Sequence, residues 1–310
     1  MEEVLKVAIL GAGAMGSLFA TFLSKNSRND DVFLIDHRKD KIDKINDKGI
    51  GLRNKLGKTS FYKIGAYKND EEIPEVDLIF VFVKSIKNQE ALSKIVPIIG
   101  KETILVSLQN GYGNDKDLED FQDKSHVVIG STTHGATLIA DGEVFHAGSG
   151  MTYLGENDQN KQSVKVIYEL LKGIGLDVEI TEDIERLVIE KLFINIGINP
   201  ITALIDKENA CIYENAYARD MSRLLVYEAC DVFKLYGYDF NREEIFSKVL
   251  ETAKKTGKNT SSMRADLRRG NETEISKING IIAEKARMKK VESPYNEAIS
   301  LLIKAKEEKK

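Results

Sequence analysis

The sequence is poor in residues that define several special classes of protein. It has two cysteines, four histidines, four prolines and no tryptophan in 310 residues. Cys211 and Cys230 alone cannot form the disulfide framework of a small secreted domain, so we expect a reducing, cytoplasmic environment. The histidines, cysteines and acids form no cluster with metal-ligand spacing, so we expect no metal. No Pro-rich linker or internal repeat divides the chain.

The chain also lacks a long apolar run and a large excess of either charge. No stretch approaches the ~18 consecutive apolar residues of a membrane span, and Met1 leads directly into a strand pattern, which leaves no room for a signal peptide. The formal net charge is −4, with acids and lysines mixed along the sequence. We therefore expect neither a membrane nor a nucleic-acid partner. A content of 42% hydrophobic and 30% charged residues is that of a globular protein.

Short apolar segments separated by helical patterns fill the first half of the sequence. Each segment has the length of a buried parallel strand, and strands joined through helices predict right-handed βαβ units in a doubly wound sheet. A Gly-interrupted hairpin is expected over residues 143–155. The expected strands are residues 7–10, 32–35, 78–83, 104–108, 127–130 and 177–180, with helices at 15–25 and 162–171.

After residue 181 the strand signal fades and helical patterns continue to the C-terminus. Helices are expected at residues 183–204, 216–236, 242–254, 275–287 and 295–306. Asn241 precedes two glutamates as an N-cap would, and Pro294 stands at a first helical position. The predicted fold class is α/β, an N-terminal Rossmann-type doubly wound sheet followed by an all-α C-terminal domain. The predicted domains are a dinucleotide-binding domain, residues 1–181, and a helical substrate and catalytic domain, residues 182–310.

A glycine motif follows the first expected strand and opens the first expected helix. Residues 11–16 read Gly-Ala-Gly-Ala-Met-Gly, which is the G-x-G-x-x-G dinucleotide fingerprint. Its first glycine permits a tight turn, the second lets a pyrophosphate approach the backbone, and the third lets helix and strand pack closely. The helix N-terminus supplies free N–H groups and a positive potential for the phosphates. The residues expected to bind the cofactor here are Gly11, Gly13, Ala14, Met15 and Gly16.

Two residues after the second strand bear on the choice of nucleotide. Asp36 falls 20 residues after Gly16, where a carboxylate accepts hydrogen bonds from ribose hydroxyls and repels a 2′-phosphate, favouring NAD(H). Arg38 could instead bind a 2′-phosphate, with His37 assisting. NAD(H) and NADP(H) therefore both stay open, with Asp36 favouring NAD(H).

A polar stripe runs along one otherwise apolar helix of the second half. Lys191, Asn195 and Asn199 are spaced four residues apart, so they lie above one another on one helix face. Burying an ammonium group and two amides costs several kcal/mol unless something satisfies them. A ligand would do so, which makes this stripe the candidate for the surface that faces the nicotinamide. Alternatively, the lysine reaches water and Asn199, before Pro200, marks a helix stop or kink.

Further motifs occur in order along the chain. Lys84 and Asn110 each follow an apolar strand, at the carboxyl ends where doubly wound sheets bind ligands. Glu-Lys-Leu-x-x-Asn-x-x-x-Asn-Pro spans residues 190–200, Asn-x-Ser-Ser-Met spans 259–263, and Thr-Glu-Ile-x-x-Ile-Asn-Gly spans 273–280. With the fingerprint, these motifs resemble the ketopantoate reductase (2-dehydropantoate 2-reductase) family, within the 6-phosphogluconate-dehydrogenase-like superfamily. The resemblance covers almost the full chain.

The resemblance implies a role for each matching residue. It makes Lys191 the general acid and Glu274 a catalytic-site carboxylate. It makes Asn110 a contact of both cofactor and substrate, and Lys84 part of the active-site mouth beside the cofactor. The substrate-binding residues that it implies are Asn195, Asn199, Ser262, Asn110 and, in a weaker motif, Asn209. Family members that use NADP(H) carry a basic residue near position 36, so Asp36 departs from the family pattern.

These residues suit the reduction of a 2-keto acid. A lysine ammonium can stabilise the developing alkoxide and donate its proton. The expected function is NAD(P)H-dependent reduction of 2-dehydropantoate to pantoate, a step toward coenzyme A, with a small keto acid as partner. A related enzyme acting on another 2-keto or 3-hydroxy acid is the first alternative. A non-catalytic dinucleotide sensor is the second, and it gives no reason for the polar stripe.

Several other residues have simpler interpretations. Arg264, Arg268 and Arg269 are expected to form a solvated face, and Ser262 is a candidate N-cap for a following helix. His134 is expected in a structural or cofactor-side role, and His146 has no evident partner in the sequence. Apolar helix faces in the second half could form either a core or a homodimer interface.

Overall fold

The computed structural model describes residues 5–25, 31–68 and 73–308. The chain divides into two compact units, Met1–Glu185 and Arg186–Lys310. The boundary expected from the sequence, after residue 181, lies just before this division.

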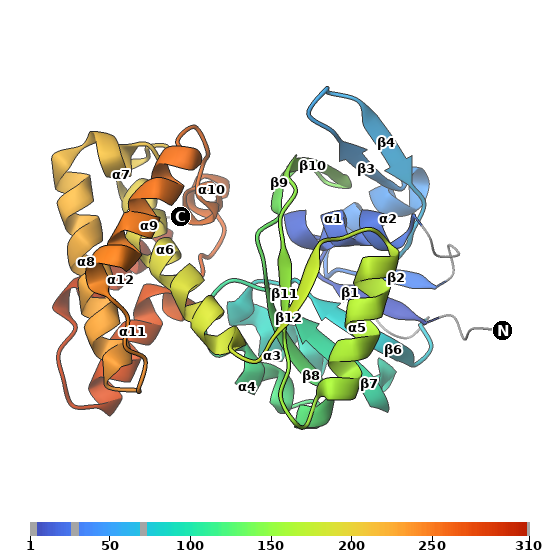
Figure 1. The fold of residues 1–310 in the computed structure, drawn as a ribbon. Coiled ribbons are helices and arrows are strands. Elements are labelled where there is room, and N and C mark those ends of the chain that lie inside the picture. The colour runs from blue at the N-terminus through green and yellow to red at the C-terminus, as the bar shows by residue number, and fades with distance from the viewer. Residues whose placement is uncertain (1–4, 26–30, 69–72, 309–310) are drawn as a thin grey trace. The chain divides into compact units, whose positions relative to one another are not determined.

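The first unit contains an eight-stranded sheet (Figure 1). Its strand order is β12-β11-β8-β7-β6-β1-β2-β5, and all neighbours from β8 to β5 are parallel. β11 is antiparallel to β8 and parallel to β12. The strands are β1 (Val7–Leu10), β2 (Val32–Ile35), β5 (Gly65–Tyr67), β6 (Val76–Val81), β7 (Ile99–Ser107), β8 (Val127–Thr132), β11 (Thr152–Gly155) and β12 (Val178–Thr181).

Alternate residues of the central strands supply two separate cores, because successive side chains of a strand point to opposite faces. Val7 and Ile9 of β1 belong to the core that includes residues of helices α1 and α5. Ala8 and Leu10 belong to the core that includes residues of α3 and α4. The doubly wound α/β prediction is confirmed. The helices are α1 (Ala14–Leu23), α2 (Lys39–Lys48), α3 (Asn88–Ser93), α4 (Asn114–Glu119) and α5 (Lys161–Gly173), with 3₁₀ turns η2 (Ser85–Lys87), η3 (Val96–Ile98) and η4 (Lys124–His126).

A second, four-stranded sheet was not expected from the sequence. Its order is β4 (Thr59–Tyr62), β3 (Ile50–Arg53), β10 (Glu143–Gly148) and β9 (Gly135–Ala140). β10 is antiparallel to β9 and parallel to β3. The predicted hairpin over residues 143–155 is therefore wrong, because its two halves, β10 and β11, join different sheets. Helix α1 packs against β9 and β10 (Figure 1).

The second unit is helical, as predicted. Its elements are α6 (Ile184–Ile205), which begins in the last residues of the first unit, α7 (Cys211–Glu214), α8 (Ala216–Lys234), α9 (Arg242–Lys255), α10 (Ser262–Arg269), η5 (Ile275–Lys277), α11 (Asn279–Met288) and α12 (Pro294–Glu307). Asn241 caps α9 by accepting from the N–H groups of Glu243 and Glu244. The helix expected from residue 275 begins at Asn279 instead, after the 3₁₀ turn.

Helix α6 is the central element for the candidate site. It has a low polar content, and by length and composition it is the one described helix that could cross a membrane. In the structure 61% of its most apolar 18-residue window is buried, and a mostly buried core helix passes the same test of length and composition. Pro200 lies inside α6, and the helix continues to Ile205, so Asn199 does not precede a helix stop.

Candidate functional site

The fingerprint turn lies between β1 and α1, and its glycines are required for different reasons. Gly11 has φ +107°, and a Cβ there would lie 2.7 Å from the backbone nitrogen of Val83. A Cβ on Gly16 would lie 1.9 Å from the carbonyl oxygen of Gly11. A Cβ on Gly13 would meet only the carbonyl oxygen of Phe82, at 4.0 Å. Gly13 therefore leaves open space beside the N-terminus of α1, as the close approach of a pyrophosphate requires.

Asp36 follows β2 and binds this turn. Its Oδ2 accepts hydrogen bonds from the backbone nitrogen of Ala12 at 3.0 Å and from Nζ of Lys41 at 2.9 Å. Its Oδ1 accepts from the backbone nitrogen of Arg38 at 3.0 Å. Burial alone would raise the pKa of Asp36, but the charge and hydrogen bond of Lys41, with the two backbone donors, lower it overall. Asp36 is therefore an ionised, pre-positioned acceptor.

Arg38 is engaged with the turn of the second sheet. Its guanidinium forms an ion pair with Asp141, between β9 and β10, and a longer one with Asp40 at 3.8 Å. Burial tends to raise the pKa of Asp141, but hydrogen bonds from Arg38 and Lys44 and the positive charges of Arg38 and Lys41 lower it overall. The positive charge of Arg38, which a 2′-phosphate would need, is thus paired with Asp141. Nε of Arg38 is buried and has no hydrogen-bond partner among the described residues.

Lys84 and Asn110 follow two neighbouring parallel strands, β6 and β7. The fingerprint follows β1, and Asp36 follows β2. The order β7-β6-β1-β2 therefore brings all four positions to one edge of the sheet, at its carboxyl ends. Gln109 helps to fix this edge, because its Nε2 donates to the carbonyl oxygen of Val83 at 2.6 Å and to Oδ1 of Asn88 at 2.7 Å.

The polar stripe on α6 contains an unsatisfied amide. Nδ2 of Asn199 donates to Oδ1 of Asn195 at 3.3 Å, whereas Nδ2 of Asn195 is buried and has no hydrogen-bond partner among the described residues. A buried donor without a partner costs about 1–3 kcal/mol. A ligand that accepts this hydrogen bond would remove that cost.

Lys191 lies on the same helix and interacts with Glu274. Burial lowers the pKa of Lys191 to about 8, and the negative charge of Glu274 opposes this change. The two residues implied as catalytic, from α6 and from the segment before η5, are therefore electrostatically coupled. An ammonium group with a pKa near neutrality can donate its proton more readily than an ordinary lysine.

The segment before α10 is tied to the end of α6. The N-cap of α10 is Ser261, whose Oγ accepts from the backbone nitrogen of Arg264 at 3.2 Å and pairs with Oγ1 of Thr202 at 2.7 Å. The candidate N-cap, Ser262, is instead the first residue of α10, and it is exposed. The exposed Ser262 hydroxyl thus stands on a helix start that the Ser261–Thr202 pair positions.

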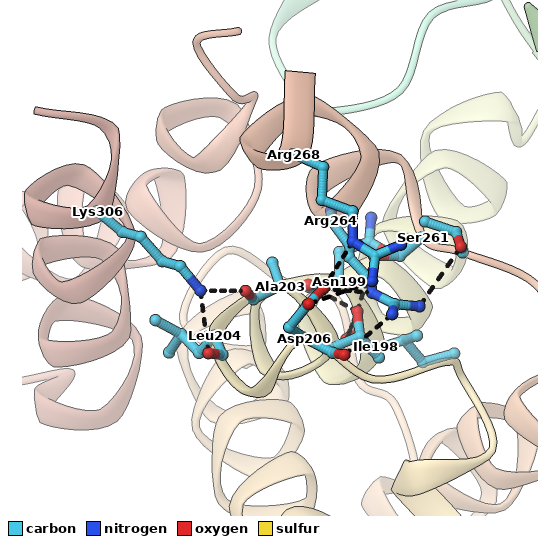
Figure 2. Close-up of polar contacts among 11 residues, drawn as sticks. Ile198, Asn199, Ala203, Leu204, Asp206, Ser261, Arg264, Arg268 and Lys306 are labelled. Atoms are coloured by element: carbon cyan, nitrogen blue, oxygen red, sulfur yellow. Dashed lines mark hydrogen bonds and ion pairs between the residues drawn. The ribbon is translucent and has the colours of Figure 1, made fainter. Parts of the chain in front are cut away.

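Arg264 does not belong to a solvated face, and that prediction is wrong for it. It is only 7% exposed, because its guanidinium binds the side chain and backbone of Asp206, just after α6. Arg268 binds the same carboxylate, with distances of 2.8 and 3.1 Å. Figure 2 shows both guanidinium groups at Asp206, and Lys306 donating to the carbonyl oxygens of Ala203 and Leu204 at 2.8 and 3.1 Å.

Asn209 lies near the Asn-x-Ser-Ser-Met segment. Its backbone nitrogen donates to the carbonyl oxygen of Asn259 at 3.2 Å, and its Nδ2 donates to Oγ1 of Thr256 at 3.0 Å. Its Oδ1 is buried and has no hydrogen-bond partner among the described residues. This makes Asn209 a second amide with unused hydrogen-bonding capacity.

His134 has a partner that sequence reasoning missed. Its Nδ1 lies 3.3 Å from Nε2 of His146, so His146 is not isolated. The His134 ring also packs against Phe19 and Phe22 of α1. Burial, and then the nearby His146, lower the pKa of His134. A largely neutral imidazole of this kind fits a structural role beside the fingerprint helix.

Within residues 5–25, 31–68 and 73–308, no three His, Cys, Asp or Glu side chains are grouped so that they could hold a metal ion.

The most informative residue that sequence reasoning missed is Lys41. It lies on a helix with the sequence Lys-Asp-Lys-Ile-Asp-Lys-Ile-Asn-Asp-Lys, in which no lysine stands out by composition. Its position was nevertheless detectable, because it is four residues before the buried Ile45 and therefore on the same face.

Comparisons with known proteins identify the family of the chain. The family model described as ketopantoate reductase PanE/ApbA matches residues 7–159, and the model of its C-terminal part matches residues 183–307. The 2-dehydropantoate 2-reductase of Pyrococcus abyssi is 33% identical over 98% of this chain and 98% of its own. That of Pyrococcus horikoshii is 34% identical over 98% of each chain.

Solved structures give the same result. A ternary structure of D-mandelate dehydrogenase with NADH and anilino(oxo)acetate is 28% identical and has a TM-score of 0.92, covering 98% of each chain. A 2-dehydropantoate 2-reductase from Geobacter metallireducens has 25% identity and a TM-score of 0.87, covering 97% of this chain and 99% of its own. By its matching family models and its relatives over nearly the full length, the chain belongs to the ketopantoate reductase family.

Proposed function

We propose that this protein reduces 2-dehydropantoate to pantoate with a reduced nicotinamide dinucleotide. The observation that carries the proposal is the electrostatic coupling of a half-buried Lys191 to Glu274, on a unit where Nδ2 of Asn195 is a buried donor without a hydrogen-bond partner among the described residues. The curated relatives named 2-dehydropantoate 2-reductase support the choice of substrate. The open space at Gly13 and the acceptor at Asp36 fit a dinucleotide.

In this function the nicotinamide would supply the hydride to the carbonyl carbon. Lys191 would stabilise the oxygen that becomes an alkoxide and donate its proton from Nζ. Asn195 and Asn199 would bind the substrate's oxygens as neutral donors, with Asn209 and Ser262 assisting. Glu274 would keep Lys191 protonated at neutral pH, since its negative charge raises the pKa of that lysine. Lys84 and Asn110 would contact the cofactor at the edge of the sheet.

We propose NADH as the preferred nucleotide. Asp36 stands at the end of β2 as an ionised acceptor, and Arg38 is held by Asp141. The D-mandelate dehydrogenase structures contain NADH and support this preference.

A cytoplasmic location and a homodimer stay predictions. Light scattering on the purified protein tests the homodimer.

The experiment follows oxidation of NADH and of NADPH by absorbance, with 2-dehydropantoate as substrate. A higher kcat/KM with NADH supports both the reaction and the nucleotide preference. If the dinucleotide binds but 2-dehydropantoate is not reduced, the proposed substrate is wrong. Oxidation that persists unchanged in Lys191→Ala would remove Lys191 as the general acid.

A second candidate is the reduction of a 2-keto acid with an aromatic substituent. The likeness to D-mandelate dehydrogenase, with a TM-score of 0.92 at 28% identity, favours it. A panel of 2-keto acids with aliphatic and aromatic substituents separates the two candidates. A kcat/KM at least tenfold higher for an aromatic keto acid than for 2-dehydropantoate would select the second, since about 1.4 kcal/mol of transition-state binding gives that ratio.

A further inference from the structure

Lys41 is a buried lysine bonded to Asp36, the carboxylate expected to bind the ribose. Its side chain extends from the first turn of α2, and the residue is only 7% exposed. Nζ donates to Oδ2 of Asp36 at 2.9 Å and to the carbonyl oxygen of Ala12 at 3.2 Å. Lysine is almost never buried unless it is paired. Lys41 therefore joins the fingerprint turn to the carboxylate that follows β2.

Asp36 can affect nucleotide binding through two properties, and its pairing with Lys41 acts on them differently. The first is hydrogen-bond acceptance. An ionised carboxylate offers about four acceptor sites, and the donors described above occupy two on Oδ2 and one on Oδ1. Capacity on Oδ1 therefore remains for a ribose hydroxyl. The second property is negative charge, which the ammonium of Lys41 compensates at hydrogen-bond distance.

The surrounding charges do not replace this compensation. The guanidinium of Arg38 and the ammonium of Lys44 are both directed to Asp141. His37 lies 3.5 Å from Oδ1 of Asp36, but its side chain is 82% exposed. Lys41 is thus the buried cation that acts on Asp36 within the described part of the chain.

We propose that Lys41 is a specificity-determining residue, because by neutralising Asp36 it reduces the repulsion that this carboxylate exerts on a 2′-phosphate. The proposal rests on dinucleotide binding as proposed above, but not on the identity of the keto acid. It predicts that this protein discriminates between NADH and NADPH less strongly than Asp36 alone would. Lys41 would then set how far the enzyme accepts the phosphorylated cofactor.

A purely structural role gives a different prediction. If Lys41 only holds the turn at Ala12, its loss loosens the site for both nucleotides alike. The ratio of the two affinities then stays constant. If Lys41 acts by charge, its loss weakens binding of the 2′-phosphate form selectively. The ratio of dissociation constants therefore distinguishes the two roles.

The test is calorimetric titration of the full-length protein with NADH and NADPH, and with ADP-ribose and its 2′-phosphate, without keto acid. In Lys41→Met we expect the affinity for the 2′-phosphate form, relative to the other, to fall by about tenfold, since an uncompensated charge then faces the phosphate. In Asp36→Asn the relative affinity should rise by about tenfold, because Lys41 is left as a lone cation. The double variant should lie between the two single variants.

Lys44→Met is the matched control. Lys44 lies on the same helix, its side chain is 59% exposed, and it pairs with Asp141 rather than Asp36. Its substitution should change the ratio by less than about twofold, because exposed charges are screened by solvent. A change as large as that of Lys41→Met would mean that the net charge of the region, not the Lys41–Asp36 pair, sets selectivity, and would overturn the proposal.

Thermal unfolding of each variant accompanies the titrations. If Lys41→Met does not fold, Lys41→Gln removes the charge and keeps a hydrogen-bond donor, and the same change in ratio is expected from it. An unchanged ratio in a folded variant overturns the proposal. Absence of keto-acid reduction with normal nucleotide binding would overturn only the proposed substrate. Absence of binding of either nucleotide to the unmodified protein would overturn both.

Discussion

Nε of Arg264 donates to Oδ1 of Asp206 at 2.8 Å, and its Nη2 donates to the backbone oxygen of the same residue at 2.9 Å. Asp206 has a φ of +53°, in the left-handed region that few residues other than glycine adopt. A buried guanidinium therefore holds the chain at the point where it leaves α6. Because Arg264 belongs to α10, this contact fixes the helix that carries Ser262 against the helix that carries Lys191.

Replacing Arg264 with methionine should loosen this contact. We expect the free energy of unfolding to fall by about 2–3 kcal/mol, as for other losses of a buried hydrogen-bond network. We also expect KM for the keto acid to rise more than kcat falls, because Ser262 moves while Lys191 keeps its place. Arg268→Met is the control: Arg268 binds the same carboxylate but its side chain is 53% exposed, so it should lower Tm much less. Equal effects of the two variants would contradict the role given to Arg264.

The pH dependence of turnover should report Lys191. Since the pKa of Lys191 is lowered to about 8, the proton that it donates is lost as the pH rises through that value. We expect kcat to fall above about pH 8, and Lys191→Ala to lower kcat by about 10²–10⁴. Glu274→Gln should move the fall to lower pH, because the negative charge that raises the pKa of Lys191 is removed. A fall that stays in place in Glu274→Gln would mean that another group titrates.

Lys191 should also reduce the stability of the fold. Its pKa is about 8 in the folded protein and 10.5 as the ordinary value, so the unfolded chain binds its proton more tightly. The destabilisation is therefore complete below pH 8 and is lost as the pH approaches 10.5. Lys191→Met should raise the free energy of unfolding at pH 7 by about 1–3 kcal/mol, after allowance for partial solvent exposure.

Denaturant unfolding at pH 7 and pH 10 measures this effect. The gain from Lys191→Met should be smaller at pH 10. Lys165→Met, on the exposed face of α5 where Lys165 pairs weakly with Glu169 at 3.9 Å, should show no comparable gain at either pH. A destabilised Lys191→Met would mean that the lysine contributes to the fold instead of being tolerated for function.

Two glycines of the fingerprint should respond differently to alanine. In Gly16→Ala the new methyl group would lie 1.9 Å from the carbonyl oxygen of Gly11, so α1 must move and a fall in stability of about 3 kcal/mol or more is expected. In Gly13→Ala the nearest atom is 4.0 Å away. That variant should keep its Tm but lose dinucleotide affinity, because the methyl group occupies the space for the pyrophosphate. Calorimetry and thermal unfolding on the two proteins check this contrast.

The main sheet and the helical unit were predictable because their cores repeat a simple pattern. β1 and β2 are runs of four buried apolar residues that end at a glycine or an acid. Such runs predict parallel strands without knowledge of their neighbours. Helices α8, α9 and α12 follow from their apolar periodicity, and the start of α9 follows from Asn241.

The second sheet was not predictable in the same way. β4 (Thr-Ser-Phe-Tyr) and β9 (Gly-Ala-Thr-Leu-Ile-Ala) contain no fully buried residue. Neither is a run of four consecutive apolar residues like β1 and β2. β10 and β11 are close in sequence and look like one hairpin, yet long-range pairing sends them to different sheets. Pairing with β3, which is distant along the chain, is a property that local pattern does not contain.

For the candidate site, sequence reasoning located side chains but not their partners. The spacing of four on α6 predicted that Asn195 and Asn199 lie on one helix face, and the two side chains are hydrogen-bonded there. It did not predict that Arg264 is buried, because its partner Asp206 lies 58 residues away. Lys41 was missed because its significance depends on its contacts with Asp36, five residues before it, and with Ala12, 29 residues before it.

The parallel pairing of β3 with β10 makes two distant stretches of the chain structurally interdependent. Each of these stretches also forms an antiparallel hairpin, β3 with β4 and β10 with β9. If the strand of an exchanged hairpin does not pair in register, the other hairpin presents an open strand edge, a common origin of aggregation. Recombination within this family should therefore succeed when both hairpins come from one parent and fail when they are mixed. Asp141 lies in the turn between β9 and β10 and pairs with Arg38. Arg38 should therefore come from the same parent as the two hairpins.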